Sequence, residues 1–480
     1  MAPQANQLHF LLFPLMAQGH MIPMVDFARL LAQRGAKITI VTTPYNATRF
    51  EAVLARAIES GLQIQLVLLE FPCEEAGLPE SCQNLDMIPS SQLVPNFFTA
   101  LSLLEQPAAK LANELIPKPN CIISDMCFPW TVNIARTFQI PRITFHGFCC
   151  FCLFCMKSLA DSKLLDNISS ETGSLVIPDL PDQIQMTKVQ LSGLFDHMMK
   201  SAGGKLLAAE MESYGVIINS FEELEPAYVK EYKKKRGDKV WCVGPVSLCN
   251  NNRTDKAQRG NKSYVDEDQC LKWLDSWKPS SVVYVCLGSL SCGLGLEASN
   301  KPFIWVISAG SKYEEVEKWI VDDGFKERIK GRGLLIRGWA PQVLILSHPS
   351  VGGFLTHCGW NSTLEGISTG VPLLTWPLLG DQFLNEKLVV QVLNIAISLG
   401  VEIPTNWGEE KTVVLVKKET VKSAIEKLMD EGEESKDRRE RARELGEKAK
   451  KAVEEGGSSH LNITLLIEQI KHLGTCEQTN

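Results

Sequence analysis

A histidine and an aspartate follow two short apolar runs near the start of the chain. His20 comes shortly after the run at residues 8–13, and Asp125 closes the run at residues 122–125. A histidine that titrates near neutral pH can take the proton from an attacking hydroxyl, and a carboxylate beside it can orient the ring and stabilise the imidazolium. If the two runs are neighbouring strands, His20 and Asp125 are predicted to form a general base. The alternative is that His20 only caps the helix that follows it.

A second group of polar residues follows the apolar run at residues 352–356. The chain passes through His357 and a glycine into an amphipathic stretch that has Asn361 and Ser362 in its first turn. A strand that leads into a helix in this way leaves free backbone N–H groups and the positive end of the helix dipole where an anion can bind. The histidine, amide and hydroxyl add further donors. The pattern predicts a phosphate site, although strand–turn–helix units with a glycine are common in α/β proteins.

Residues around this stretch have side chains suited to the other parts of a nucleotide sugar. Trp339 offers a flat face for a base, and Glu365 can accept hydrogen bonds from two ribose hydroxyls. Asp381 and Gln382 combine acceptors and donors, as the recognition of sugar hydroxyls requires. A single tryptophan, however, more often belongs to a hydrophobic core.

The whole stretch 339–382 resembles the signature of plant secondary-product UDP-glycosyltransferases, and the flanking sequence is similar to that family from Leu8 to about Leu473. The resemblance implies that His20 and Asp125 are the catalytic pair. It also implies that Trp339 stacks on uracil, that the backbone of Ala340 bonds the base, and that Gln342 and Glu365 hold the ribose. The donor-binding residues that the resemblance implies are Ser289, Trp339, Ala340, Gln342, His357, Trp360, Asn361, Ser362, Glu365, Asp381 and Gln382.

The resemblance also bears on the donor and on the reaction. Gln382 is typical of family members that use glucose, and Trp360 stands where glucuronate users tend to carry arginine. We therefore expect UDP-glucose as the co-substrate, no cofactor, and direct displacement that converts an α-linked donor into a β-glucoside. The acidic triplet 266–268 fits the Asp-x-Asp pattern of metal-dependent glycosyltransferases, but it lies in a linker and is interpreted as a solvated turn. No metal ligands are predicted.

The acceptor is expected to be a small hydrophobic alcohol, because the resemblance assigns the acceptor pocket to the N-terminal half and the candidate walls there are mostly apolar. Triterpenoid sapogenins and flavonoids are the favoured classes. Each candidate is equally well explained as a core residue, and His146 in particular fits a buried histidine better than a second base. The candidate wall residues are Phe128, His146, Phe151, Phe154, Leu194 and Met198.

The predicted catalytic and donor-binding residues can act together only if the strands that they follow end at one cleft. Apolar runs at 8–13 and 37–42 flank a helical pattern, which is a βαβ unit and therefore predicts a parallel sheet. A second series of this kind follows later in the chain, so the fold class is α/β, and the resemblance implies GT-B, two Rossmann-like doubly wound domains facing a central cleft. The expected divisions are an N-terminal acceptor-binding domain at 1–246, a linker at 247–268, a UDP-sugar-binding domain at 269–455, and a last helix at 456–480 that packs back on the N-terminal domain.

One region departs from the family. Between Ser289 and Phe303 the family normally carries about a dozen more residues, so the crossover helix is expected to be close to its lower length limit, and Gly293 and Gly295 weaken it further. The shortening leaves a second hypothesis open, a catalytically impaired homologue that binds a UDP-sugar or a hormone. A nicotinamide-dependent dehydrogenase is excluded, because no GxGxxG pattern follows the first strand.

The charge, hydropathy and cysteine content of the chain indicate which partners and which compartment to expect. The 480 residues carry a net charge of −7, which gives no electrostatic footprint for nucleic acid or an anionic membrane. No apolar stretch is long enough to predict a membrane span, and we expect a cytoplasmic monomer whose partners are a UDP-sugar and a small acceptor. Four of the fifteen cysteines cluster at 149–155 and are interpreted as small buried side chains, with a zinc site as the alternative.

Overall fold

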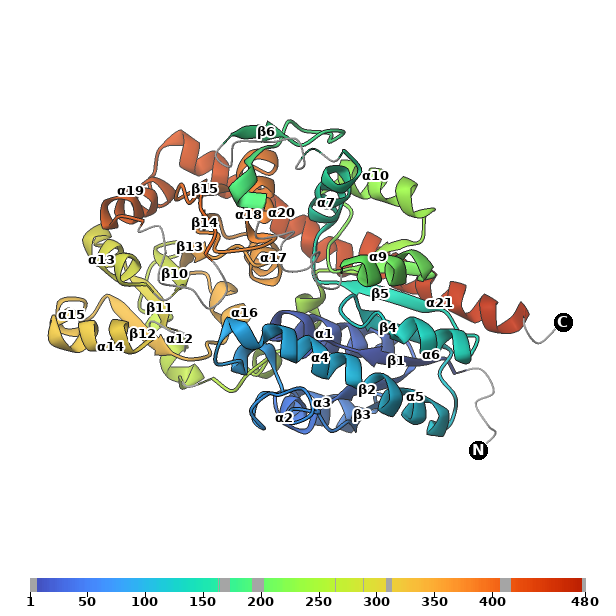
Figure 1. Cartoon of the computed structure of the whole chain (residues 1–480). Helices are drawn as coiled ribbons and strands as arrows, with labels where there is room; N and C mark the ends of the chain where they lie inside the picture. The colour runs from blue at the N-terminus through green and yellow to red at the C-terminus, as the bar shows by residue number, and fades with distance from the viewer. Residues whose placement is uncertain are drawn as a thin grey trace.

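Two parallel β-sheets, each covered by helices, form the centres of two domains in the computed structural model of the chain (Figure 1). The structure describes residues 7–162, 164, 173–191, 203–263, 265–287, 289–307, 313–405 and 416–476. Two of the predicted acceptor-wall residues, Leu194 and Met198, lie outside these ranges.

The N-terminal sheet has seven strands within the described residues, in the order β3-β2-β1-β4-β5-β8-β9, and every pair of neighbours is parallel. Its central strands are apolar and fully buried because helices cover both faces of the sheet. The strands are β1 (His9–Phe13), β2 (Lys37–Thr42), β3 (Ile64–Leu68), β4 (Cys121–Asp125), β5 (Arg142–His146), β8 (Gly215–Ile218) and β9 (Val240–Cys242). A small antiparallel pair, β6 (Ser174–Val176) and β7 (Gln185–Thr187), lies apart from it.

The C-terminal sheet has six strands within the described residues, in the order β12-β11-β10-β13-β14-β15, again with parallel neighbours. The strands are β10 (Val282–Cys286), β11 (Phe303–Ile307), β12 (Gly333–Arg337), β13 (Val351–Thr356), β14 (Leu373–Thr375) and β15 (Ala396–Ser398). Both sheets reverse their winding direction at the centre, between β1 and β4 in one and between β10 and β13 in the other. In such sheets ligands bind at the carboxyl ends of the strands beside that point.

The helices follow the strands in alternation. Those of the N-terminal domain are α1 (Gln18–Gln33), α2 (Pro44–Thr48), α3 (Glu51–Glu59), α4 (Val94–Leu103), α5 (Glu105–Glu114), α6 (Thr131–Thr137), α7 (Cys150–Ser162), α9 (Gly203–Glu212) and α10 (Pro226–Arg236), with the 3-10 helices η1 (Leu85–Met87) and η2 (Ser91–Leu93). Those of the C-terminal domain are α12 (Glu267–Asp275), α13 (Leu290–Ser299), α14 (Tyr313–Asp322), α15 (Phe325–Arg328), α16 (Gln342–Leu346), α17 (Trp360–Thr369), α18 (Gln382–Lys387), the π-helix η5 (Leu388–Val392), α19 (Lys418–Leu428) and α20 (Glu433–Val453).

The last helix, α21 (Ser458–Cys476), leaves the C-terminal domain and runs along the N-terminal sheet (Figure 1). Its apolar side chains Ile463, Leu466 and Ile470 join the core of the N-terminal domain. Asn462 donates a hydrogen bond of 3.0 Å to the carbonyl of Cys242 at the end of β9. The helix therefore ties the two domains together.

The segment predicted as a linker is folded and anchored. It contains the 3-10 helix η4 (Val246–Cys249) and the short helix α11 (Arg253–Ala257). The acidic triplet is not a free turn, because the carboxylate of Asp266 caps α12 by accepting from the backbone N–H of Gln269. Buried Arg29 of α1 donates to Asn250 at 2.7 Å and to Asp255 at 2.8 Å, and so holds this segment against the N-terminal domain.

The shortened crossover still forms a helix. α13 spans ten residues between β10 and β11, capped by the hydroxyl of Ser289, which accepts from the N–H of Cys292. The two glycines allow close packing instead of weakening the helix. A Cβ at Gly293 would lie 2.7 Å from the ring of Trp305 beneath it, and one at Gly295 would clash with Val421 of α19. The short crossover therefore packs directly against β11 and α19.

The cysteine cluster lies in a hydrophobic core. Cys150, Cys152 and Cys155 on α7, and Cys149 just before it, are fully buried. Burial raises the pKa of all four thiols well above the usual value. Within the described residues, no three side chains of histidine, cysteine, aspartate or glutamate are grouped so that they could hold a metal ion.

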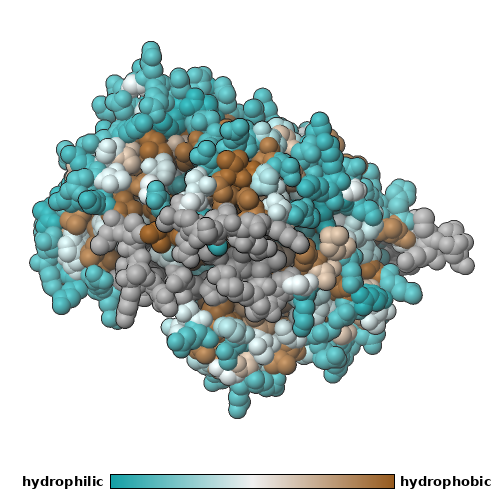
Figure 2. All heavy atoms as spheres, turned by 45° about the horizontal axis from the view of Figure 1, so that its top comes forward, coloured by the Kyte–Doolittle hydropathy of each residue, from teal (hydrophilic) through white to brown (hydrophobic). Residues whose placement is uncertain are grey.

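Hydrophilic side chains dominate the outline of the face shown in Figure 2, and hydrophobic ones appear in smaller groups inside that outline. The exposed positions of α20 are largely lysine, arginine and glutamate. Among the helices in the described part of the chain, none combines the length and the apolar character that crossing a membrane requires.

Candidate active site

The predicted base forms where two neighbouring strands of the N-terminal sheet end. β1 pairs with β4 so that Phe13 lies opposite Ser124, which brings the loop after β1 next to Asp125. The Nδ1 atom of His20 lies 2.7 Å from Oδ2 of Asp125. Asp125 is fully buried, and its other oxygen accepts a hydrogen bond from the N–H of Cys127. His20 lies inside α1, whose N-cap is Ala17, and its ring bonds the carboxylate, so its role is not that of a helix cap.

The electrostatics of this pair suit proton abstraction. Burial alone lowers the pKa of His20, but the charge and hydrogen bond of Asp125, together with the charge of Asp381, raise it above its ordinary value of 6.5. Burial raises the pKa of Asp125, and the attraction of His20 outweighs this and lowers it. Because an ionised carboxylate can only accept, Nδ1 of His20 is the donor and Nε2 remains as the acceptor for a substrate proton.

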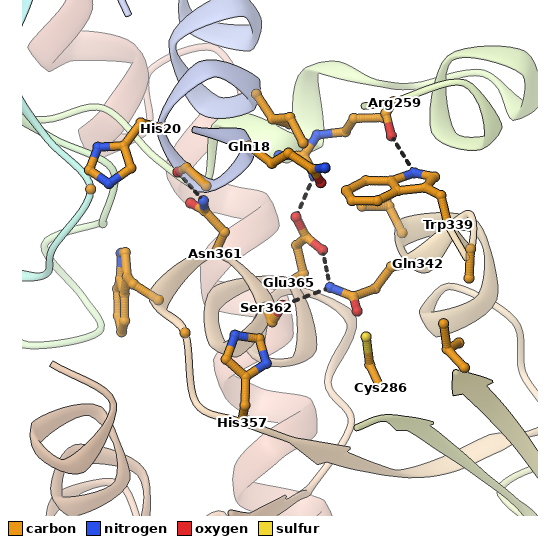
Figure 3. Close-up of a pocket in the computed structure, with 18 of the residues that line it drawn as sticks. Gln18, His20, Arg259, Cys286, Trp339, Gln342, His357, Asn361, Ser362 and Glu365 are labelled. Carbon is orange, nitrogen blue, oxygen red and sulfur yellow. Dashed lines mark hydrogen bonds and ion pairs between the residues drawn. The ribbon is translucent and has the colours of Figure 1, made fainter. Parts of the chain in front are cut away.

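A single cavity of about 410 Å³ joins the base to the predicted donor residues. His20 lines it from the N-terminal domain, and Figure 3 shows it facing the same space as the labelled residues of the C-terminal domain. Of the predicted donor residues, the cavity wall includes Trp339, Ala340, Gln342, His357, Trp360, Asn361, Ser362, Glu365 and Asp381. Among the described residues, the predicted positions that do not form part of this wall are Ser289 and Gln382.

The predicted phosphate site is built at the N-terminus of α17. β13 ends at Thr356, the chain turns at Cys358 with a φ of 64°, and Gly359 is the N-cap. A Cβ at Gly359 would lie 2.5 Å from Nε2 of His357, so glycine allows the imidazole to lie against the turn. Burial lowers the pKa of His357 to about 4, which keeps the ring neutral near pH 7. A neutral ring beside a helix N-terminus can donate a hydrogen bond to an oxyanion.

The predicted ribose site is already organised by hydrogen bonds. Gln342 donates to Oε2 of Glu365 at 2.7 Å and to the hydroxyl of Ser362 at 3.0 Å (Figure 3). The other oxygen of Glu365 is paired with Arg259, a residue of the interdomain segment that sequence reasoning did not select. The indole N–H of Trp339 donates to the backbone carbonyl of Arg259 at 3.3 Å.

The three residues predicted to contact the sugar already have hydrogen-bond partners within the protein. Burial raises the pKa of Asp381 to about 6, and its carboxylate accepts from Asn385 at 2.8 Å. Trp360 is almost fully buried, and its N–H donates to the carbonyl of Asn219 at 2.7 Å. The side-chain oxygen of Gln382 accepts from two backbone N–H groups, at 2.8 and 3.1 Å, and so holds the preceding turn.

The described acceptor-wall candidates are core residues, which corrects that prediction. Phe128 is 1% exposed and packs on Trp130, while Phe151 and Phe154 pack on Tyr228. His146 is also buried, and its Nε2 atom lies 3.0 Å from Glu210, as the alternative interpretation held.

Other residues form the wall beside the base instead. Phe148 and Gly147, which follow β5, line the cavity near His20. Sequence reasoning also missed Gln18, Lys256 and Arg259 on the wall. The position of Phe148 just beyond a strand end was the one signal that could have indicated the wall.

Contacts between the domains close the site. Asn361 donates to the carbonyl of Gly19, and Asn219 donates to Asn361 at 3.3 Å. Gly19 precedes the predicted base directly, so the helix that offers the phosphate site touches the first turn of α1, the helix that carries His20. Two doubly wound domains that face a shared cleft form the GT-B architecture.

Comparison with known proteins identifies the family. Residues 248–428 match the family model described as UDP-glucoronosyl and UDP-glucosyl transferase, and residues 6–248 match the glycosyltransferase N-terminal domain. The chain is 57% identical to UDP-glycosyltransferase 1 of Barbarea vulgaris over 97% of each chain. It is 56% identical to UDP-glycosyltransferase 73C5 of Arabidopsis thaliana over 98% of each.

Solved structures agree with this assignment. The crystal structure of Glycyrrhiza uralensis UGT73P12 complexed with glycyrrhetinic acid 3-O-monoglucuronide superposes with a TM-score of 0.90 at 36% identity, covering 99% of this chain and 98% of that one. Arabidopsis thaliana UGT89C1 complexed with quercetin gives a TM-score of 0.73 at 27% identity, over 97% and 100% of the two chains. The chain therefore belongs to the plant UDP-glycosyltransferases, which transfer a sugar from a UDP-sugar to a small molecule.

Proposed function

We propose that this enzyme transfers glucose from UDP-glucose to a hydroxyl or carboxyl group of a small hydrophobic plant metabolite, such as a triterpenoid sapogenin or a flavonoid, with inversion to a β-glucoside. The observation that carries the proposal is that His20, paired with buried Asp125, faces the same cavity as His357 and the N-terminus of α17. A base on one side and a diphosphate site on the other are what direct displacement at a sugar carbon needs.

The step follows from this geometry. The acceptor oxygen attacks the anomeric carbon as its proton passes to Nε2 of His20, and the bond from that carbon to the UDP oxygen breaks. Asp125 stabilises the imidazolium that forms. His357, Asn361, Ser362 and the helix terminus stabilise the charge that grows on UDP. The proposal assigns this neutralisation to protein groups, with neither a metal ion nor a cofactor.

The donor is proposed from the cavity wall. Trp339 and the Ala340 backbone would hold uracil, and Gln342 with Glu365 the ribose, in line with their places on the wall. Asp381 and Trp360 would face the hexose. Glucose is proposed from the resemblance that Gln382 carries, although in this structure Gln382 does not line the cavity and its side-chain oxygen holds the turn before it.

The acceptor class is proposed from apolar chemistry and from the relatives. Phe148 and Ile22 contribute apolar surface to the wall near His20. The ligands named for the two solved neighbours, glycyrrhetinic acid 3-O-monoglucuronide and quercetin, motivate the triterpenoid and flavonoid classes. We also propose that the enzyme works as a monomer in the reducing cytosol, where its buried thiols would stay protonated.

A screen tests the proposal. Purified enzyme is incubated with UDP-glucose and a mixed panel of plant aglycones, and products are read by the mass gain of one hexosyl group. Proton NMR of the product gives the anomeric configuration. A β-glucoside is expected with at least one polycyclic aglycone, and an α-linked product would rule out direct displacement.

The second candidate is a catalytically impaired homologue that binds a UDP-sugar or a hormone. The shortened segment before β11 favours it, because Ser289 uses its hydroxyl to cap α13. Calorimetric binding of UDP combined with no turnover across the panel would support this candidate and reject the first.

A further inference from the structure

Arg259 lies between the two domains and is nearly buried, with 9% of its side chain exposed. Its Nε atom donates to Oδ2 of Asp26 at 2.6 Å, and its Nη1 atom pairs with Oε1 of Glu365. Asp26 lies on α1, the helix that carries His20, and Glu365 lies on α17, whose N-terminus forms the phosphate site. A single guanidinium thus connects the helix of the base to the helix of the donor site.

The environment of Arg259 is a compact set of buried charges. Asp26 is 3% and Glu365 6% exposed, and Arg29 pairs with Asp255 at 2.8 Å beside them. Removing Arg259 leaves Asp26 with Arg29 and Asn250 as partners. Among the described residues, it leaves the Glu365 carboxylate with only the neutral amide of Gln342, in a medium that solvates a charge poorly. The placement of Glu365 therefore depends on Arg259.

The backbone of Arg259 and Gly260 contacts the predicted base-binding tryptophan. The carbonyl of Arg259 accepts from the indole N–H of Trp339 (Figure 3). Gly260, at a φ of 88°, lies so close to Trp339 that a Cβ there would clash with the indole and lie 2.9 Å from Cδ1 of Ile22. The interdomain segment is therefore part of the wall that fixes Trp339.

Glu365 keeps the capacity to bind a ligand while it is held. Each carboxylate oxygen has about two lone-pair sites. One site of Oε1 is used by Arg259 and one site of Oε2 by Gln342. One acceptor site remains on each oxygen, which matches the two hydroxyls of a ribose, and Glu365 lines the cavity.

We propose that Arg259 is a positioning residue for the donor. It fixes the Glu365 carboxylate so that both oxygens face the ribose hydroxyls, and through Asp26 it ties that placement to the helix that carries the catalytic histidine. The inference rests on the proposed assignment of Glu365 to the ribose. It gives the interdomain segment a role in nucleotide recognition.

The test compares two ligands that differ only in the ribose hydroxyls. UDP and 2′,3′-dideoxyuridine diphosphate are titrated into the enzyme by calorimetry, and the ratio of their dissociation constants isolates what Glu365 contributes. Two charge-assisted hydrogen bonds make a wild-type ratio of about 100 the expected result. In Arg259→Met the ratio should fall to about 10 or less.

Three controls make the outcome decisive. Arg253→Met removes an exposed arginine of the same segment that pairs with Asp268, and its ratio should equal that of wild type. Arg259→Lys keeps the charge but cannot bond Asp26 and Glu365 as a fork, so its ratio should fall at least about threefold. If Arg259→Met does not fold, this variant decides. Glu365→Gln should reduce the ratio in the same way as Arg259→Met.

A purely structural role for Arg259 predicts something different. It would lower the unfolding temperature and weaken both ligands equally, leaving the ratio at its wild-type value, and that result overturns the inference. Failure of the proposed function is separable, because a wild-type enzyme that binds neither ligand would show that the cavity is not a uridine diphosphate site at all.

Discussion

Two histidines stand beside the points where the two sheets reverse their winding direction, and their surroundings differ. His20 follows β1 in the first sheet, and His357 follows β13 in the second. Asp125 lies 2.7 Å from His20 and raises its pKa above 6.5, whereas burial alone acts on His357 and lowers its pKa to about 4. We therefore propose that the same side chain acts as a base on one side of the cavity and as a neutral hydrogen-bond donor on the other. The comparison teaches that the partner of the ring decides its role.

The largest expected effect comes from removing the base. His20→Ala should lower kcat/KM by about 10⁴-fold, because the acceptor hydroxyl loses the group that takes its proton. UDP affinity should change by less than about threefold, since the donor residues lie on the other domain. Steady-state kinetics and calorimetry measure the two quantities. Turnover at the wild-type rate would mean that another group is the base.

Removing the charge that distinguishes the two histidines should have the next largest effect. Asp125→Asn should lower kcat/KM by about 10³-fold, because the ring loses its orienting acceptor. The raised pKa of His20 means that activity falls as the pH drops through a value above 6.5, when the ring becomes protonated. Without the carboxylate this acid limb should move to lower pH.

The matched control for this change is Asp161→Asn, which neutralises a half-exposed carboxylate on α7 that pairs with Lys157. It should leave both the rate and the acid limb unchanged. An acid limb at the same pH in Asp125→Asn and wild type would show that the titrating group is not His20.

Removing the neutral donor His357 should lower the rate less than removing the base His20 does. His357→Ala should lower kcat by about 10²-fold, a loss in the range found when one donor to a developing oxyanion is removed. Because the pKa of His357 is about 4, its protonation does not enter the pH profile near neutrality, and the acid limb should stay where the wild type has it. If the acid limb of the pH profile moves in His357→Ala, then His357 and not His20 is the ring that titrates as the base.

The smallest effect is expected from the turn that positions His357. Gly359→Ala would place a Cβ 2.5 Å from Nε2 of that ring and should displace it, lowering UDP affinity by about tenfold. Gly204→Ala is the control, because a Cβ there meets nothing within 4 Å. If both variants bind UDP like the wild type, the ring is not held by this turn.

Much of this arrangement could be predicted from the sequence, because the ends of apolar runs indicate where strands end. Alternating apolar runs and helical patterns predict parallel sheets, and parallel strands bring His20 and Asp125 to one edge. The GT-B class and the donor signature came from resemblance, which the comparisons support at the level of the family.

What escaped prediction depends on side-chain direction and on distant contacts. Phe151 and Phe154 lie on an apolar helix, and a sequence cannot tell which face of a helix so uniformly apolar points to a cavity and which to the core. Arg259 lies in a polar stretch without periodicity, and its partners Asp26 and Glu365 are far from it in sequence. Gly293 and Gly295 look like helix breakers until the side chains packed on them are seen.

The central claim, that the partner of each ring sets its role, is tested most directly by titrating both histidines. Long-range nitrogen–proton NMR of enzyme with labelled histidine, assigned with His20→Ala and His357→Ala, gives each pKa in turn. The account predicts that His20 titrates above 6.5 and that His357 is still neutral at pH 5.5. Two rings that titrate together near 6.5 would contradict it.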